Sequence, residues 1–259
     1  MIRAAALAVL LAQGTTGLAA GQVGRTWHYT RSNDDGSRPE AVHVHVPAQG
    51  EVAVMKAVER CTRAALVTAR IDPASGQASE LVGGQLGRDG RQQAFAWFKE
   101  DDTGQITARA ALPEGELKLA TPVGTRPWHL YDFDFASLTL WLANRLDRRS
   151  DFRIGLPLLL IGSQGPSLSD LGALEGRFLA DTHWMGRPAL LFRLEGPALG
   201  GKSGTIMLDA AAGHILDARL PIPNHDGYRD FRLRLAGVDD GAEAWTRTLA
   251  AHWRGCKAG

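Results

Sequence analysis

The sequence predicts a mainly β protein: one large antiparallel sheet, curved or partly closed into a barrel, with one internal helix and one C-terminal helix. Apolar and polar residues alternate with a period of two along many short segments, turns rich in Asp and Gly separate these segments, and only two segments show helical spacing. Residues 21–259 have the length of one β-rich domain, and no linker rich in Gly, Ser or Pro divides them.

The N-terminal residues have the features of a secretory signal peptide. A basic residue, Arg3, precedes an apolar run over 4–12, and the small residues Gly17 and Ala19 have the spacing of a cleavage site. We therefore expect residues 1–20 to be removed on export to the periplasm or the medium. A membrane anchor is the alternative, but QGTT at 13–16 interrupts the run, and a spanning helix needs about 20 apolar residues. The mature protein is not expected to span a membrane.

The strands are predicted from turns and alternation. The turns DPASG, DDTG and DAAAG each combine an Asp that can bond the turn backbone with a Gly that can adopt positive φ. Val42, Val44 and Val46 form one apolar face of a strand, and residues 231–235 alternate in the same way. Segments such as 51–59, 64–71 and 94–98 carry apolar or small residues on both sides. Such strands lie under a covering helix or form the wall of a ligand cavity.

Two segments have helical spacing. The internal helix is expected over 135–146, FASLTLWLANRL, with Asp134 as its N-cap. The C-terminal helix is expected over 240–254, with a capping-box-like start at Asp240 and an end at Gly255.

The two cysteines, Cys61 and Cys256, are most simply explained as one disulfide in an exported chain. Two buried free thiols are the alternative. If the disulfide forms, it fastens the C-terminal helix to the segment around Cys61.

Composition excludes several function classes. The chain has 29 basic and 28 acidic residues, mixed along its length, so it has no basic run that would follow a nucleic-acid backbone. We find no serine-hydrolase elbow, dinucleotide fingerprint, P-loop, CxxC or EF-hand loop, so we predict no cofactor and nominate no catalytic residue.

Two histidines one residue apart are the first candidate for chemistry. In AVHVHVP, His43 and His45 point to the same face of a strand, as a two-histidine metal site requires, but a third ligand at a recognised spacing is missing. One solvated face of a strand is the interpretation we favour, so no metal is favoured.

A dense aromatic and acidic run, PWHLYDFDF at 127–135, is the second candidate. Trp128, Tyr131 and Phe133 could form the apolar rim of a ligand pocket, with Asp132 as a polar anchor. The same residues could instead make a strand-to-helix corner that closes the core. The segment PNHDGYRD at 223–230 offers His, Asp, Tyr and Arg close together, and either an acid–base group or an exposed hairpin turn explains it.

Five segments carry a resemblance to a group of exported proteins: TWHYTRSNDDGS, RCTRAALVTARID, PWHLYDFDFASL, PNHDGYRDFRLRL and the closing Trp253 and Cys256. In these the chain resembles uncharacterised exported proteobacterial β-rich proteins of the domain-of-unknown-function type. The resemblance implies export, a single β-rich domain and pairing of Cys61 with Cys256. More loosely, the pattern is similar to the curved half-barrels that carry lipid or lipoprotein acyl chains across the periplasm.

These observations lead to three hypotheses. The first is a non-enzymatic binding or carrier module for an apolar small molecule or lipid, whose binding residues include Trp128, Tyr131, Asp132 and Phe133. The second is a metal-binding protein or metal-dependent hydrolase that uses His43 and His45. The third is a structural or interaction protein of the cell envelope that pairs through a sheet edge.

Overall fold

The described part of the chain forms one antiparallel sheet of 14 strands and two α-helices, as the sequence predicts. The computed structural model describes residues 22–72, 75–113, 115–162 and 165–257, so the predicted signal peptide lies outside the described residues. The strands are β1 (Thr26–Ser32), β2 (Glu40–His45), β3 (Glu51–Ala57), β4 (Ala65–Ile71), β5 (Ala78–Leu86), β6 (Gln92–Glu100), β7 (Gln105–Leu112), β8 (Gly115–Pro122), β9 (Phe152–Gly162), β10 (Gly165–Trp184), β11 (Arg187–Glu195), β12 (Gly204–Asp209), β13 (Ile215–Leu220) and β14 (Phe231–Asp239). The helices are α1 (Ala136–Ala143) and α2 (Ala242–Trp253), with short 3-10 turns η2 (Tyr131–Phe133) and η3 (Pro197–Leu199).

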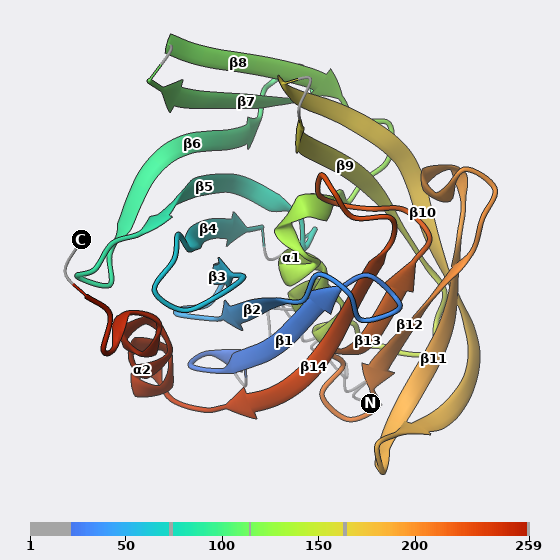
Figure 1. The fold of residues 1–259 in the computed structure, drawn as a ribbon. Helices are drawn as coiled ribbons and strands as arrows, with labels where there is room; N and C mark the ends of the chain where they lie inside the picture. Colours follow the sequence, from blue (N-terminus) through green and yellow to red (C-terminus); the bar gives the residue numbers. More distant parts are fainter. Residues whose placement is uncertain (1–21, 73–74, 114, 163–164, 258–259) are drawn as a thin grey trace, which may run out of the picture.

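The sheet consists of two runs of neighbouring strands that meet in the middle. β1 to β8 follow one another in the sheet, as do β9 to β14, and the pairing of β1 with β14 joins the two runs. The edges are therefore β8 and β9, and the sheet curves round without closing (Figure 1). The segment after β8 crosses to the β9 edge, where His129 N donates to Gly155 O at 3.0 Å and Gly155 N donates to Pro127 O at 2.8 Å. Part of the open edge of β9 is thus covered by the chain itself.

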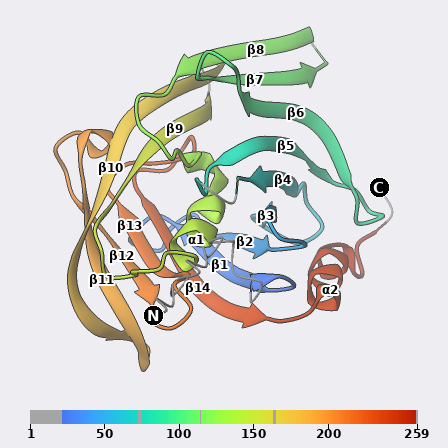
Figure 2. The ribbon, with the colours of Figure 1, turned by 180° about the vertical axis from the view of Figure 1, so that it is seen from behind.

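Helix α1 lies inside the curve of the sheet, and both ribbon views show strands around it (Figures 1 and 2). It is apolar on every side, which is typical of a helix buried all round. The helix is shorter than predicted, because Asn144 ends it by donating from Nδ2 to Leu140 O at 2.7 Å. The predicted N-cap was wrong: Phe135 occupies that position, and the Asp134 carboxylate bonds elsewhere.

Aromatic side chains from the sheet and from the segment before α1 fill the space around the helix. Trp27 and Tyr29 of β1 and Phe231 of β14 point inward, and each is 2% exposed or less. The Phe135 ring packs on Phe231 at 5.3 Å between ring centroids, and on Tyr131 at the same distance. The concave side of the sheet is in this way occupied by the protein's own core.

Helix α2 covers part of the opposite face of the sheet. Leu249 packs with Met55 of β3 and Leu66 of β4 in a small second core, beside Trp245. This explains why β3 and β4 are apolar on both sides: one face meets the main core and the other meets α2. β6 has no such cover, and its residues are mostly half-buried or exposed.

The predicted disulfide is confirmed. Cys61 and Cys256 are joined at an S–S distance of 2.03 Å and fasten the end of α2 to the loop between β3 and β4. Gly255 has φ of +77° directly after Arg254, so the glycine ends the helix as expected. In the part of the chain that the structure describes, we find no helix long and apolar enough to span a membrane.

Candidate functional site

On three neighbouring strands, the row of apolar residues that faces the core has a charged residue at one end. Trp27 and Tyr29 are followed on β1 by Arg31, the valines of β2 are preceded by Glu40, and the valines of β3 are followed by Lys56. Because alternate residues of a strand share a face, all three charges point toward the interior at one end of the sheet. They meet the two segments in which the sequence showed unusual polar chemistry. We call the resulting group the polar cluster; it comprises Arg31, Glu40, Lys56, Asp132, Asp134, Asn224, His225 and Tyr228.

Lys56 and Asp134 form the centre of the polar cluster. The Lys56 ammonium lies 3.0 Å from Asp134 Oδ2, donates to Asp132 O at 2.7 Å and lies 3.3 Å from His225 Nε2. Asp134 is fully buried, and its Oδ1 accepts from Asn224 Nδ2 at 2.8 Å. The segment before α1 is therefore fastened both to β3 and to the loop before β14.

Arg31 supplies the second buried cation. Its guanidinium forms an ion pair with Glu40, lies 3.5 Å from Asp134 and contacts His225 Nδ1. It also donates to the Tyr228 hydroxyl at 3.1 Å, and its carbon lies 4.4 Å from the centre of that ring. The arginine thus joins β1, β2 and the loop over 223–230.

The environment separates the pKa values of the two aspartates. Burial alone would raise the pKa of Asp134, but the Lys56 ammonium and the Arg31 guanidinium outweigh it and hold the pKa at about 2. Burial raises the pKa of Asp132 to about 7, and Lys56 only partly opposes this shift. Burial and the Lys56 charge lower the pKa of His225 to about 3, so its imidazole is neutral near pH 7. With a pKa of about 7, the half-buried Asp132 can take up or release a proton near neutral pH.

The three aromatic residues predicted to line a pocket lie in the core. Trp128 and Tyr131 are 0% exposed and Phe133 is 2% exposed. Trp128 Nε1 donates to Glu100 at 2.8 Å, and the Tyr131 hydroxyl donates to Ile222 O at 2.8 Å, so their polar ends are engaged. Asp132 is half-buried in this corner, and its Oδ1 accepts from Leu159 N at 3.3 Å. This arrangement agrees with a strand-to-helix corner, and ligand binding by these residues stays a prediction.

The structure gives His43 and His45 different neighbours. His43 Nδ1 lies 2.7 Å from Nδ1 of His28, its cross-strand partner on β1. His45 is buried, bonds Thr26 Oγ1 at 2.9 Å and stacks on Trp245 at 5.1 Å. Burial, and next the charge of His28, lower the pKa of His43 to about 4. Within the described ranges, no three His, Cys, Asp or Glu side chains are grouped as metal ligands.

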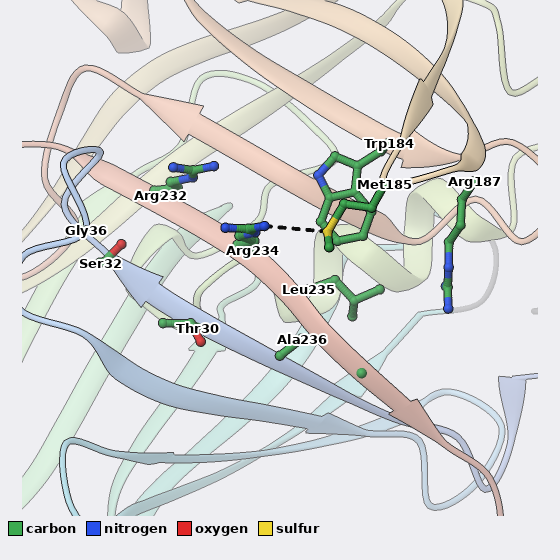
Figure 3. A pocket seen from close by; sticks show the side chains of 11 residues that line it. Thr30, Ser32, Gly36, Trp184, Met185, Arg187, Arg232, Arg234, Leu235 and Ala236 are labelled. Carbon is green, nitrogen blue, oxygen red and sulfur yellow. Dashed lines mark hydrogen bonds between the residues drawn. The ribbon is translucent and has the colours of Figure 1, made fainter.

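A pocket that the sequence analysis did not predict lies between the tip of the β10–β11 hairpin and the strands β1 and β14 (Figure 3). β12 and β13 have six residues each, whereas β10 has 20, so the long hairpin reaches past them to β14. We call this the hairpin pocket. It has a volume of about 540 Å³ and is lined by Thr30, Ser32, Gly36, Trp184, Met185, Arg187, Arg232, Arg234, Leu235, Ala236 and Gly237.

The shape of the hairpin pocket is set by a tight turn and by strand alternation. Met185 and Gly186 have φ of +46° and +82°, as a two-residue hairpin turn requires, and Trp184 pairs with Arg187 across it. Phe231 and Leu233 of β14 point into the core, so Arg232 and Arg234 point to the other face, toward the hairpin. The Arg234 guanidinium lies 3.5 Å from the Met185 sulfur (Figure 3).

Sequence reasoning found part of the polar cluster and missed the hairpin pocket. It nominated Asp132 and the segment 223–230 separately, and the structure brings them together. The signal for the missing members was present, because Arg31 and Lys56 each interrupt an apolar face. The pocket had no comparable signal, since its walls come from strands that are three to five places apart in the sheet.

Comparison with known proteins adds no further assignment. No protein-family model matches the chain, and a search of curated proteins finds no similar sequence.

Proposed function

We propose that this protein is a non-enzymatic binding or carrier module of the periplasm or the extracellular medium, and that its ligand binds with an apolar part in the hairpin pocket. The observation that carries the proposal is the composition of this pocket: Trp184 and Met185 supply apolar and aromatic contact area beside polar groups. Small-molecule sites combine these features in volumes of about 300–1,000 Å³, and the hairpin pocket has about 540 Å³.

The filled interior supports a site on the outer face of the sheet. The residues that face the concave side of the sheet pack against α1 and against one another, and Phe135 and Leu138 are no more than 1% exposed. A ligand at Trp128 or Tyr131 would have to displace these contacts. At the hairpin tip no such displacement is needed, because Met185 is already 72% exposed.

The compartment is part of the proposal. The disulfide between Cys61 and Cys256 agrees with an oxidising environment, where such bonds persist. The predicted signal peptide points to the same compartment.

The test begins with the mature chain purified untagged from a periplasmic fraction. Native mass spectrometry with and without organic extraction is expected to show a bound mass that extraction removes. Binding of an apolar fluorescent probe to the stripped protein should then weaken in Trp184→Ala. Trp97→Ala is the matched control, since Trp97 is a 42%-exposed tryptophan of β6 that does not line the hairpin pocket. A bare chain that binds no apolar probe would refute the proposal.

A further inference from the structure

The hairpin pocket carries an excess of positive charge. Arg187, Arg232 and Arg234 line it, and no carboxylate does. On the neighbouring strand, Asp217 pairs directly across from Arg234 in the β13–β14 ladder and is 2% exposed.

Both oxygens of Asp217 are committed to other arginines. Its Oδ1 accepts from Arg219 Nε at 3.1 Å, and its Oδ2 accepts from Arg232 Nη2 at 2.9 Å. Arg232 is thereby neutralised, and Arg234 is left out of the network. Among the residues that the structure describes, neither Arg234 nor Arg187 has an ion pair.

The group that Arg234 does contact is a weak acceptor. Its guanidinium meets the Met185 sulfur at 3.5 Å, whereas an arginine with a matched partner makes two short bonds to a carboxylate or phosphate. In Figure 3 Arg232 and Arg234 extend from β14, while Trp184 and Met185 approach Arg234 from the hairpin. An acidic group at Arg234 would therefore have apolar side chains beside it.

We infer that the ligand of the hairpin pocket carries an acidic group, a carboxylate or a phosphate, that pairs with Arg234 while its apolar part lies along Trp184 and Met185. This inference rests on the proposed function and names the ligand class: an amphiphilic anion. Arg187, on the other side of the hairpin turn, adds a second unpaired cation that favours the same sign of charge.

The test compares ligands that share one chain and differ in the head group. Isothermal titration of the intact, disulfide-bonded protein uses decanoate, decyl phosphate, 1-decanol and decyltrimethylammonium, with acetate and inorganic phosphate as anions without the chain. The two decyl anions are expected to bind at least about fivefold more tightly than decanol, as a charge-assisted contact in a solvated pocket allows, and the cation should bind most weakly. The preference should decrease as salt is added.

The outcomes separate the two proposals. If no decyl compound binds, the proposed function fails and this inference fails with it. If all decyl compounds bind equally, the apolar site stands and the acidic head group is refuted. If phosphate alone binds as tightly as decyl phosphate, the site holds a free anion, and the apolar contact is refuted.

A variant tests the role of Arg234 itself. Arg234→Gln should bind decanol as the wild type does, while decanoate loses its preference over decanol. Arg247→Gln is the control, because Arg247 is an arginine of α2 with 63% side-chain exposure, away from the pocket. A wild-type preference in Arg234→Gln would overturn the assignment.

Discussion

Replacing Lys56 with Met tests whether the polar cluster fastens the segment before α1 to the sheet. Lys56 is 8% exposed, and the variant keeps the length of its aliphatic stem while removing the charge. Asp134, which is fully buried, then loses its ion pair at 3.0 Å and retains Asn224 and the more distant Arg31. We therefore expect a large loss of stability from one side chain.

The size of this loss can be bounded from the pKa of Asp134. Lowering this pKa from 3.8 to about 2 corresponds to about 2–3 kcal/mol of stabilisation of the ionised carboxylate. The loss has an upper limit, because Asp134 can take up a proton instead. At pH 7 this costs about 4 kcal/mol for a group of ordinary pKa, and together with the lost stabilisation it sets a limit of about 7 kcal/mol. We expect Lys56→Met to lower the free energy of unfolding by about 3–5 kcal/mol, which lies between these limits and is the usual range for breaking a buried ion pair.

The assay is urea-induced and thermal unfolding at pH 7 and pH 4. The deficit of Lys56→Met should be smaller at pH 4, where protonation of Asp134 costs less. Lys56→Met/Asp134→Asn should recover part of the loss, because the unpaired charge is gone. Lys118→Met is the control. The Lys118 side chain is 62% exposed, so its ion pair with Glu116 contributes about 0.5 kcal/mol or less to stability. A Lys56→Met variant as stable as Lys118→Met would refute the reasoning.

Three further variants test other parts of the structure. Burial raises the pKa of Asp132 from 3.8 to about 7, so the folded protein loses stability as the pH rises from about 4 to 7. Asp132→Asn should therefore match the melting temperature of the wild type at pH 4 and exceed it at pH 8. Parallel pH profiles of the two proteins would contradict this. Replacing Cys61 and Cys256 with Ser opens a loop of 195 residues, which should lower the free energy of unfolding by at most about 5 kcal/mol. Hydrogen exchange in α2 should become faster, and unchanged exchange would show that packing alone holds the helix. A Cβ at Gly155 would lie 2.2 Å from a carbonyl oxygen of the segment that crosses to β9, so Gly155→Ala should lower the free energy of unfolding in urea by about 2 kcal/mol or more. A Cβ at Gly124 would lie 3.8 Å from its nearest neighbouring atom, so Gly124→Ala should cost less. Equal losses in the two variants would be inconsistent with the close approach at Gly155.

The sequence predicted the strands and helices better than their arrangement. Alternation revealed β2 and β14, and both helices were expected, because burial of one face leaves a local pattern. The composition of residues 162–170, rich in Gly, Pro and Ser, favours a loop instead. In the structure most of this segment starts β10, and Ser167 and Ser169 alternate there with Pro166 and Leu168.

The sequence could not predict which side chains of different strands contact each other, because strand order is not a local property. His43 and His45 share a face, as predicted, but the expected solvation of this face was wrong, because His45 is buried against Trp245 of α2. The partner of His43 is His28, which the pairing of β1 with β2 brings opposite it. The polar cluster likewise depends on β1 pairing with β14, which brings Arg31 to the loop that contains His225. Each residue type was visible in the sequence, and the contact was not.

The internal helix decides where a binding function can reside. A curved sheet offers a carrier its concave side, but here α1 occupies it, and the helix is held at its start by the Asp134 contacts. Opening the concave side would both expose apolar surface and break buried ion pairs. Ligand binding would have to compensate the free-energy cost of both changes. The hairpin tip needs neither change, because Met185 is exposed and Arg234 has no carboxylate partner among the described residues. A ligand that replaces one thioether contact with an ion pair gains affinity there without disturbing the core, and this is why we assign binding to the outer face of the sheet.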